Sequence, residues 1–352
     1  MNSKIIGIGN YIPSETITNL FFDQHSFFDE RGIALKQDNA IIAEKLKQIT
    51  GIEERRYASK NQVTSDLGFI AAQNAIQDSG IDPETLDYII FAHNFGDVQF
   101  GTVQSDAVPS LASRVKHSLK IKNNFCVAYD VLFGCPGWIE GVIQANAFIK
   151  SGIAKRCLVI GAETLSRVVD IHDRDSMIYA DGAGAVVLET NTADDGIKSH
   201  LSASYTFEEK DYLFFGKSYN NEACPTTKFI KMNGRKIYEF ALSKVPDAMK
   251  KCFDASGYSI QDLNKIIIHQ ANEKMDEAIV KRFFELYNLP VPQDIMPMVI
   301  GKLGNSSVAT IPTLLKMIQN GELPSHQINK GDVVLFASVG AGMNINAFVY
   351  QY

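Results

Sequence analysis

Residues 79–91 read SGIDPETLDYIIF and residues 256–268 read SGYSIQDLNKIII, so one pattern occurs twice in the chain. In each copy a leucine lies six residues after the glycine and a mostly apolar run follows it. The two glycines are 177 positions apart, close to half of the 352 residues. Two further echoes follow in the same order, residues 157–162 against 334–339 and residues 182–188 against 340–349. Three ordered echoes predict a chain of two similar halves.

Short apolar runs alternate with helical stretches in both halves. Such runs are typical of α/β proteins, in which helices cover both faces of each sheet. The expected strands are 4–9, 88–92, 125–131, 158–162, 185–188, 266–269, 333–338 and 346–350, and the expected helices include 65–79, 136–150, 236–255, 274–287 and 307–319.

Two segments do not fit the repeat. Residues 189–229 are polar and have no partner in the other half, and residues 21–49 form a second probable insertion. The sequence therefore predicts an N-terminal half at 1–190, a linker or insertion at 191–229 and a C-terminal half at 230–352.

The composition excludes several classes of protein. Hydrophobic residues make up 45% and charged residues 21%, the balance of a globular chain. The formal net charge of −6 argues against a nucleic-acid-binding surface. No run approaches the ~18 apolar residues of a membrane span, and no signal peptide precedes the first strand pattern. The five cysteines form no CxxC pair and no zinc-ligand cluster, which favours a reducing, cytoplasmic location and no metal.

Cys135 lies in VLFGCPGW, residues 131–138, where an apolar strand ends and a helix begins near Pro136. A sulfur at a helix N-terminus is exposed to unpaired N–H groups, which favour the thiolate. Gly134 and Gly137 would let another group approach closely. A buried structural cysteine is the alternative, but the strand–glycine–cysteine–helix context makes a nucleophile equally plausible.

Two polar residues of the second half are further candidates. His269 begins HQAN directly after an apolar strand, and the carboxyl ends of buried strands are where α/β sites form. Asn305 precedes a helix, as Cys135 does, and the two are 170 positions apart, near the repeat offset. If the halves pack about a pseudo-twofold axis, the three side chains converge. The alternatives are a satisfied core histidine and an ordinary N-cap asparagine.

Two glycine motifs follow or precede strands. Residues 179–185, YADGAGA, run into a strand instead of a helix, so they lack the context of a dinucleotide fingerprint and suit a tight turn. Residues 338–343, SVGAGM, follow a strand, and their bare N–H groups could bind an oxyanion.

Taken in order, these segments resemble the thiolase-like condensing enzymes, and among them ketoacyl-acyl carrier protein synthase III most closely. The resemblance covers nearly the whole chain, and the set in order is highly specific although each motif alone is weak. The matching stretches are residues 4–13, 51–56, the Cys135 turn, 150–152, 179–185, 269–272, 304–307 and the glycine turn ending at Gly342.

The resemblance implies a five-layered αβαβα fold, a homodimer and a Cys135–His269–Asn305 triad. It implies that Cys135 takes an acyl group from a thioester while the N–H groups of Cys135 and Gly342 hold the oxyanion. His269 and Asn305 would then stabilise the enolate of a malonyl or 3-oxoacyl thioester. The substrates are acyl carrier protein or coenzyme A thioesters, with no cofactor.

The chain also departs from the family's pattern. Many members hold the adenine of coenzyme A between a tryptophan and an arginine, but Trp138 lies beside the nucleophile and Ile49 stands where arginine is common. Carrier-protein substrates are therefore favoured. Lys274, Lys281 and Arg282 are candidates for docking the acidic carrier, although an ordinary solvated face explains them equally well. Val108 falls on a loop resembling the one that closes the acyl pocket across the dimer, where it would leave room for a longer chain. Trp138 is a second pocket candidate.

Three other activities stay open. A related subgroup joins two β-oxoacyl chains into a cyclohexanedione, the precursor of dialkylresorcinols. A thioesterase or plain acyltransferase would use the same cysteine and histidine but pass the acyl group to water or an alcohol. A non-catalytic, carrier-binding partner would lack the nucleophile, which is present at Cys135.

Overall fold

Two β-sheets organise the computed structural model, which describes residues 2–223 and 226–352. The first sheet has the order β1-β7-β6-β4-β5 and the second has the order β11-β12-β13-β8. The strands of the first sheet are β1 (Asn2–Tyr11), β4 (Tyr88–Ala92), β5 (Val127–Val131), β6 (Arg156–Thr164) and β7 (Asp181–Asn191), and those of the second are β8 (Gly196–Ser204), β11 (Leu263–Ile268), β12 (Val333–Gly340) and β13 (Asn344–Gln351).

The two sheets have the same internal topology. In the first, β4 and β6 are parallel, β7 is antiparallel to β6, and β1 is antiparallel to β7. In the second, β11 and β12 are parallel, β13 is antiparallel to β12, and β8 is antiparallel to β13. The echoes in the sequence fall on the corresponding strands, so the predicted duplication is visible as repeated strand order.

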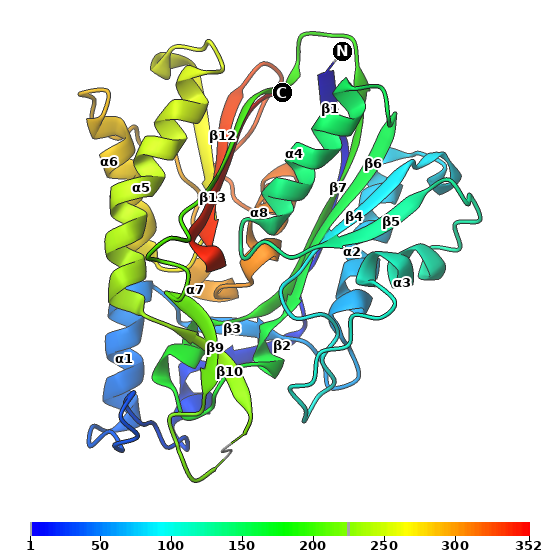
Figure 1. The fold of residues 1–352 in the computed structure, drawn as a ribbon. Coiled ribbons are helices and arrows are strands. Elements are labelled where there is room, and N and C mark those ends of the chain that lie inside the picture. The colour runs from blue at the N-terminus through cyan, green and yellow to red at the C-terminus, as the bar shows by residue number, and fades with distance from the viewer. Residues whose placement is uncertain (1, 224–225) are drawn as a thin grey trace.

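Helices form three layers around the two sheets (Figure 1). The pair α2 (Thr64–Ser79) and α3 (Leu111–Ser118) covers the outer face of the first sheet, and α5 (Gly234–Asp254) and α6 (Glu273–Glu285) cover that of the second. Between the sheets lie α4 (Gly137–Lys150) and α8 (Thr310–Gln319), whose apolar side chains share one core with both sheets. The predicted α/β class and the five-layered αβαβα architecture are therefore confirmed.

The segment predicted as linker or insertion contributes regular structure. Strand β8 completes the second sheet, while β9 (Leu213–Lys217) and β10 (Lys228–Met232) form a separate antiparallel pair. β8 is the edge strand of the second sheet, and one of its faces is largely exposed. The polar residues Lys198, His200 and Ser202 lie on that face, so the strand does not appear as an apolar run in the sequence. The division at 190 and 229 stays a prediction about domains, and part of 191–229 belongs to the second sheet.

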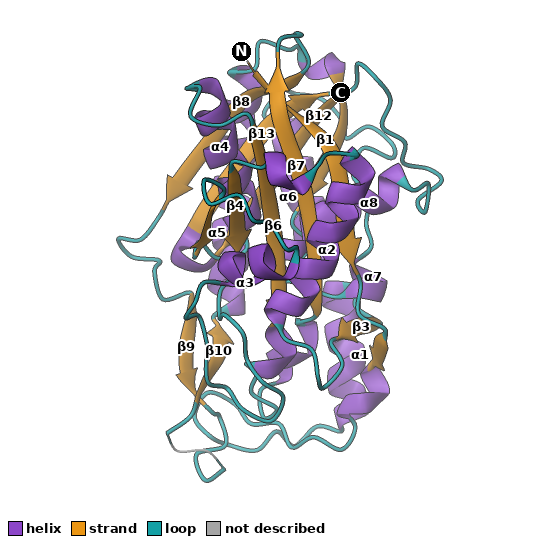
Figure 2. Ribbon diagram, turned by 90° about the vertical axis from the view of Figure 1, so that its right-hand side faces the viewer, coloured by secondary structure: helices purple, strands orange, loops and turns teal. Residues whose placement is uncertain are grey.

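A cap built from both halves covers one end of the molecule. Figure 2 shows β9 and β10 beyond the ends of the sheet strands, with α1 (Asn39–Thr50) and β3 (Glu54–Tyr57) at the same end. The region predicted as an insertion at 21–49 provides most of α1. The remaining elements of the cap and its surroundings are α1 (Asn39–Thr50), α7 (Ile300–Leu303) and the paired strands β2 (Glu15–Thr18) and β3 (Glu54–Tyr57).

Ionic contacts hold this cap to the first half. Lys231 of β10 is almost completely buried, and its Nζ lies 2.6 Å from Asp170 Oδ2 and 2.9 Å from Asp173 Oδ2. The same ammonium lies 3.4 Å from the centre of the Tyr219 ring. Both carboxylates come from the segment after β6, so the network fixes the β9–β10 pair over that end of the sheet.

Candidate active site

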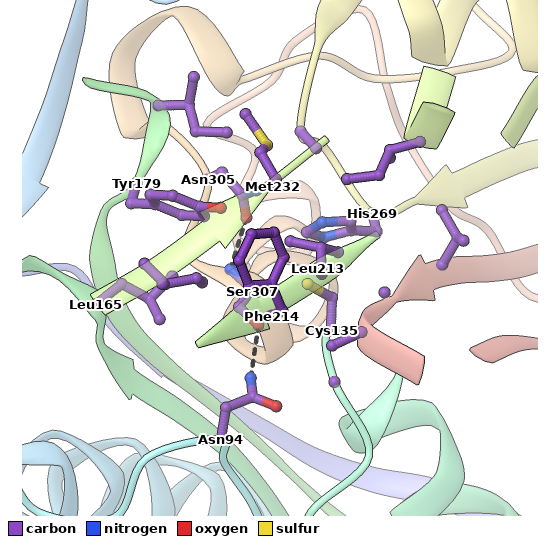
Figure 3. A pocket seen from close by; sticks show the side chains of 18 of the residues that line it. Asn94, Cys135, Leu165, Tyr179, Leu213, Phe214, Met232, His269, Asn305 and Ser307 are labelled. Carbon is purple, nitrogen blue, oxygen red and sulfur yellow. Dashed lines mark hydrogen bonds between the residues drawn. The ribbon is translucent and has the colours of Figure 1, made fainter. Parts of the chain in front are cut away.

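Cys135, His269 and Asn305 line one cavity of about 260 Å³ (Figure 3). Each comes from a different connection: the turn between β5 and α4, the segment between β11 and α6, and the loop before α8. The structure thus brings together the three side chains that the repeat predicts to converge. Among the described residues, no helix is both long and apolar enough to span a membrane.

The turn that carries Cys135 is packed tightly against the glycine turn after β12. Gly134 has a φ of +68°, and a Cβ there would lie 2.7 Å from the backbone nitrogen of Ala341. A Cβ on Gly340 would lie 2.5 Å from the backbone nitrogen of Cys135. Side chains at these two positions would push the turns apart, so the glycines set the depth of the nucleophile in the cavity.

The structure corrects the expectation that the helix N-terminus makes Cys135 a thiolate. Burial raises the pKa of Cys135 from 9 to about 11, although the Ser307 side chain lowers it in part. A shift of that size corresponds to about 2.7 kcal/mol, against about 0.3–1 kcal/mol for a charge near a helix terminus. The effect of burial on the pKa is therefore larger than that of the helix N-terminus, and Cys135 is a thiol at neutral pH.

His269 is a neutral imidazole. Its backbone N–H donates to the carbonyl of Ala337 at 2.9 Å, which continues the β11–β12 pairing into the site. Only 4% of the residue is exposed, and this burial lowers the pKa of His269 to about 4. No partner among the described residues bonds to Nδ1. The Ser307 backbone raises the pKa of His269 in part. A neutral ring has one N–H, which can donate to a substrate oxygen in place of that backbone contact.

Asn305 is held so that its amide nitrogen is available. Its backbone pairs with the first half, because Asn305 N–H donates to Ile178 at 2.9 Å and Asn305 C=O accepts from Ala180 at 2.8 Å. Its side-chain oxygen accepts from the backbone N–H of Ser307 at 2.9 Å. Asn305 is not an N-cap, because Ser306 and Ala309 occupy the N-cap positions of the two helical segments that follow. Its Oδ1 atom instead fixes the turn at Ser307, while Nδ2 forms no bond with the described residues.

Three other predicted site residues, Gly342, Trp138 and Val108, are not among the residues that line the cavity. In the glycine turn, Gly340 and Ala341 line it, whereas Gly342 lies one residue further along and approaches Asn344. Trp138 is buried at 1% exposure in the core between the sheets, where it packs near Phe348. Val108 is 87% exposed on a surface loop and is not among the residues that line the cavity of Cys135. The structure thus gives Trp138 a core position.

The candidate docking residues Lys274, Lys281 and Arg282 are exposed on α6. Arg282 donates to the carbonyl of Leu242 at 2.9 Å, and Lys281 lies 3.9 Å from Glu285. Their exposure permits a docking role and equally permits a solvated helix face.

Apolar side chains dominate the rest of the cavity, and the β9–β10 pair supplies several of them. Leu213, Phe214 and Phe215 come from β9, and Ile230 and Met232 come from β10. Phe215 stacks on Phe95, with ring centres 5.2 Å apart. The sequence placed this segment in an insertion, because nothing in its pattern shows that it folds back over the first sheet.

A second cavity of about 500 Å³ adjoins the first and leads towards α1 and α6. The two share wall residues such as Ile178, Met232 and Met275. Three cationic residues line the second cavity, namely Lys45, Arg174 and Arg235, together with Asp175.

Three polar residues of the site went unnoticed in the sequence: Asn94, Glu163 and Ser307. Asn94 and Ser307 line the cavity, and Glu163 is buried behind Asn94. Asn94 and Glu163 lie at or just beyond the carboxyl ends of β4 and β6, so the strand-end argument that selected His269 could also have selected them.

Two family models match the chain. The model described as 3-oxoacyl-[acyl-carrier-protein (ACP)] synthase III matches residues 129–204, and its C-terminal counterpart matches residues 253–352. The first match begins just before the Cys135 turn, and the second contains His269 and Asn305.

Relatives and a solved structure agree with the models. The β-ketoacyl-[acyl-carrier-protein] synthase III of Ehrlichia canis is 33% identical over 97% of this chain and 96% of its own. The β-ketoacyl-[acyl-carrier-protein] synthase III of Staphylococcus haemolyticus is 32% identical over 100% of this chain and 99% of its own. The crystal structure of 3-oxoacyl-[acyl-carrier-protein] synthase III from Aquifex aeolicus superposes with a TM-score of 0.81 at 29% identity, over 99% of this chain and 100% of that chain. This chain therefore belongs to the β-ketoacyl-acyl carrier protein synthase III family of condensing enzymes.

Proposed function

We propose that this chain captures an acyl group on Cys135 and condenses it with a malonyl- or 3-oxoacyl-carrier protein thioester. The observation that carries the proposal is the meeting of a thiol, a neutral imidazole and an oriented carboxamide in one apolar cavity. Apolar walls suit an acyl chain, while the few polar groups gather where the thioester would react.

Capture is an exchange of one thioester for another. The Cys135 sulfur attacks the acyl carbonyl, the tetrahedral intermediate collapses, and the carrier thiol leaves with the proton that Cys135 gives up. The N–H groups of Cys135 and of the glycine turn would hold the oxyanion. Ala341 is better placed for this than Gly342, because Ala341 lines the cavity beside Gly134.

Condensation then needs hydrogen-bond donors and no strong base. Neutral His269 and the free Nδ2 of Asn305 can both donate to the thioester oxygen of the second substrate and so stabilise its enolate. The enolate carbon attacks the acyl-Cys135 carbonyl and releases the cysteine sulfur. With a malonyl substrate, loss of CO₂ generates the enolate, and the released Cys135 sulfur takes up a proton from water. With a 3-oxoacyl substrate, the acidic α-proton passes to the unprotonated ring nitrogen of His269 and from there to the released Cys135 sulfur. One such donor is worth about 3 kcal/mol in comparable sites. These steps balance without a cofactor.

The second cavity suits the arm that carries each thioester. It joins the reaction cavity to the surface near α1 and α6, where Lys45, Arg174 and Arg235 supply positive charge. The exposed Lys274 lies on the adjoining first turn of α6. An acyl carrier protein is acidic, so we expect it to dock on this surface with its prosthetic arm in the second cavity.

A homodimer would cover the open edge of the first sheet. Strand β5 is the last strand of that sheet and has a neighbour on one side only. Phe125, Val127 and Leu132 are exposed on or beside it, with Phe125 at 89%. A second copy would bury both the strand edge and these side chains. The free thiols of the described cysteines suit a reducing, cytoplasmic setting.

Mass spectrometry of the intact protein tests the capture step. Incubation with an acyl-carrier protein should add one acyl mass on Cys135, and Cys135→Ala should abolish it. Cys126→Ala is the matched control, because Cys126 lies in the core away from the cavity and should leave the adduct unchanged. An adduct that persists in Cys135→Ala would overturn the assignment.

The two steps separate in a second variant. His269→Ala should still form the acyl adduct, because its donor acts after capture, but should yield almost no condensation product. Loss of the adduct together with condensation would contradict this division of roles.

A further inference from the structure

Behind Cys135, three polar side chains form a hydrogen-bonded series that the proposed steps do not use. Asn94 Nδ2 donates to Glu163 Oε1. It also donates to Ser307 Oγ at 3.1 Å, the bond drawn as a dashed line in Figure 3. Glu163 and Ser307 are 1% and 3% exposed. Burying polar groups costs folding free energy unless they are hydrogen-bonded. Three such groups beside a reactive cysteine therefore suggest a function in the reaction.

The series determines where the Ser307 hydroxyl points. The amide nitrogen of Asn94 has two hydrogens: one goes to Glu163 and the other to Ser307 Oγ. The hydroxyl oxygen therefore accepts from Asn94, and its own hydrogen is left for the cavity that Cys135 also lines. Glu163 Oε1 can accept from Asn94 whether the carboxyl is charged or carries its proton on Oε2, and in both cases the Asn94 nitrogen stays directed towards Ser307.

The backbone of Ser307 is fixed as firmly as its side chain. Ser307 has a φ of +54°, a conformation that residues other than glycine rarely adopt. It is held there by the bond from its N–H to Asn305 Oδ1 at 2.9 Å. Strain of this kind persists where the surroundings enforce it, and it concentrates at functional sites.

We propose that Ser307 is a positioning residue for the nucleophile: its hydroxyl donates to the Cys135 sulfur, and Asn94 and Glu163 keep it in the donating orientation. The inference rests on the proposed function of Cys135. A thiolate forms at this sulfur when it attacks the first thioester and again when the acyl group leaves. A fixed donor stabilises both without competing for the substrate oxygens that His269 and Asn305 address.

The electrostatics of the series agree with this arrangement. The Ser307 hydroxyl lowers the pKa of Cys135, against the larger effect of burial. Burial raises the pKa of Glu163 to about 8, so its carboxyl group is mostly uncharged at neutral pH. Once charged at higher pH, Glu163 raises the pKa of Cys135, an effect that opposes the one of Ser307. Tyr179 and His269 are the other titratable side chains that line the cavity with Cys135.

Alkylation of Cys135 by iodoacetamide tests the proposal without any acyl substrate. The rate is followed on the Cys135 peptide by mass spectrometry from pH 6 to pH 10. Ser307→Gly removes the hydroxyl while tolerating the positive φ, so the turn should stay folded. We expect a slower reaction by roughly tenfold at pH 8 and a profile shifted to higher pH, the effect of losing one hydrogen bond to a charged group.

Variants of the other two residues separate hydrogen bonding from charge. Glu163→Gln keeps an acceptor oxygen for Asn94 and should react within about threefold of the wild type. Glu163→Leu and Asn94→Leu remove the orientation and should approach the Ser307→Gly rate. Ser306→Ala is the matched control, because Ser306 faces Thr310 and should leave the profile unchanged.

Two results would overturn the inference. A Ser307→Gly profile that coincides with the wild type excludes the donor role, and a Glu163→Gln rate as low as that of Glu163→Leu excludes the orienting role of Asn94. A failure of the proposed function gives a different result. In that case no acyl adduct forms at Cys135, but the alkylation profile of Ser307→Gly is still shifted relative to the wild type.

Discussion

Replacing Lys231 by methionine should show how strongly one buried cation holds the cap over the active site. The lysine is almost completely buried and contacts two carboxylates, Asp170 and Asp173, at 2.6 and 2.9 Å. Methionine fills most of the same space but leaves both carboxylates without their counter-charge. Breaking a buried pair in this way costs about 3–5 kcal/mol.

The expected thermal shift follows from the chain length. Unfolding entropy is about 2.1 cal/mol/K per residue, so 352 residues give about 0.7 kcal/mol/K. A loss of about 3–5 kcal/mol then lowers Tm by roughly 4–7 °C. Differential scanning calorimetry measures the shift. Lys228→Met, on the same strand but exposed, is the matched control and should melt with the wild type.

The pH dependence gives the reasoning a second test. Burial raises the pKa of Asp170, but bonds from Lys231 and from backbone N–H groups outweigh it and hold the pKa below its ordinary value. Without Lys231, burial dominates, so the folded variant takes up a proton at a higher pH than the unfolded chain, whose carboxylates stay charged until about pH 4. The stability deficit should therefore narrow at pH 5. A Tm within 1 °C of the wild type at pH 7 would refute the account.

Three further outcomes follow from the site. Gly340→Ala places a methyl group 2.5 Å from the Cys135 backbone nitrogen, so adduct formation measured by mass spectrometry should fall roughly 100-fold, whereas Gly182→Ala, with its nearest neighbour at 3.4 Å, should retain it. Because burial lowers the pKa of His269 to about 4, this side chain is still a neutral donor at pH 6. The condensation rate of pre-acylated enzyme should therefore show no loss that depends on His269 between pH 8 and pH 6. A fall in that rate near pH 6.5 that disappears in His269→Gln would contradict this. Trp138→Phe should lower stability by about 1–3 kcal/mol in denaturant titrations while leaving the preferred acyl chain length unchanged, since Trp138 packs in the core; a changed preference would restore it to the pocket.

The sequence predicted the features that repeat. Strands such as β4 and β11 are buried on both faces, so they appear as plain apolar runs whose duplication survives divergence. Their carboxyl ends, together with the paired helix starts at Cys135 and Asn305, were enough to predict one shared site.

Features that depend on contacts between distant segments could not be predicted in this way. Strand β8 is partly polar because it lies at a sheet edge, and the β9–β10 pair reaches the cavity only through the fold. The pKa of Cys135 depends on how deeply the turn is buried, which local sequence does not report. Whether Ala341 or Gly342 supplies the oxyanion N–H depends on where the turn bends, and the sequence does not fix that position to within one residue.

The position of β13 in the second sheet constrains how the polypeptide can fold. β13 lies between β12 and β8, so β8 has no hydrogen-bonded neighbour in that sheet until residues 344–351 arrive. During synthesis, residues 196–204 must therefore wait for more than a hundred later residues, with both strand edges open to wrong partners. Assembly of the reaction chamber should accordingly be a late and slow event, and fragments ending before β13 should aggregate in place of folding.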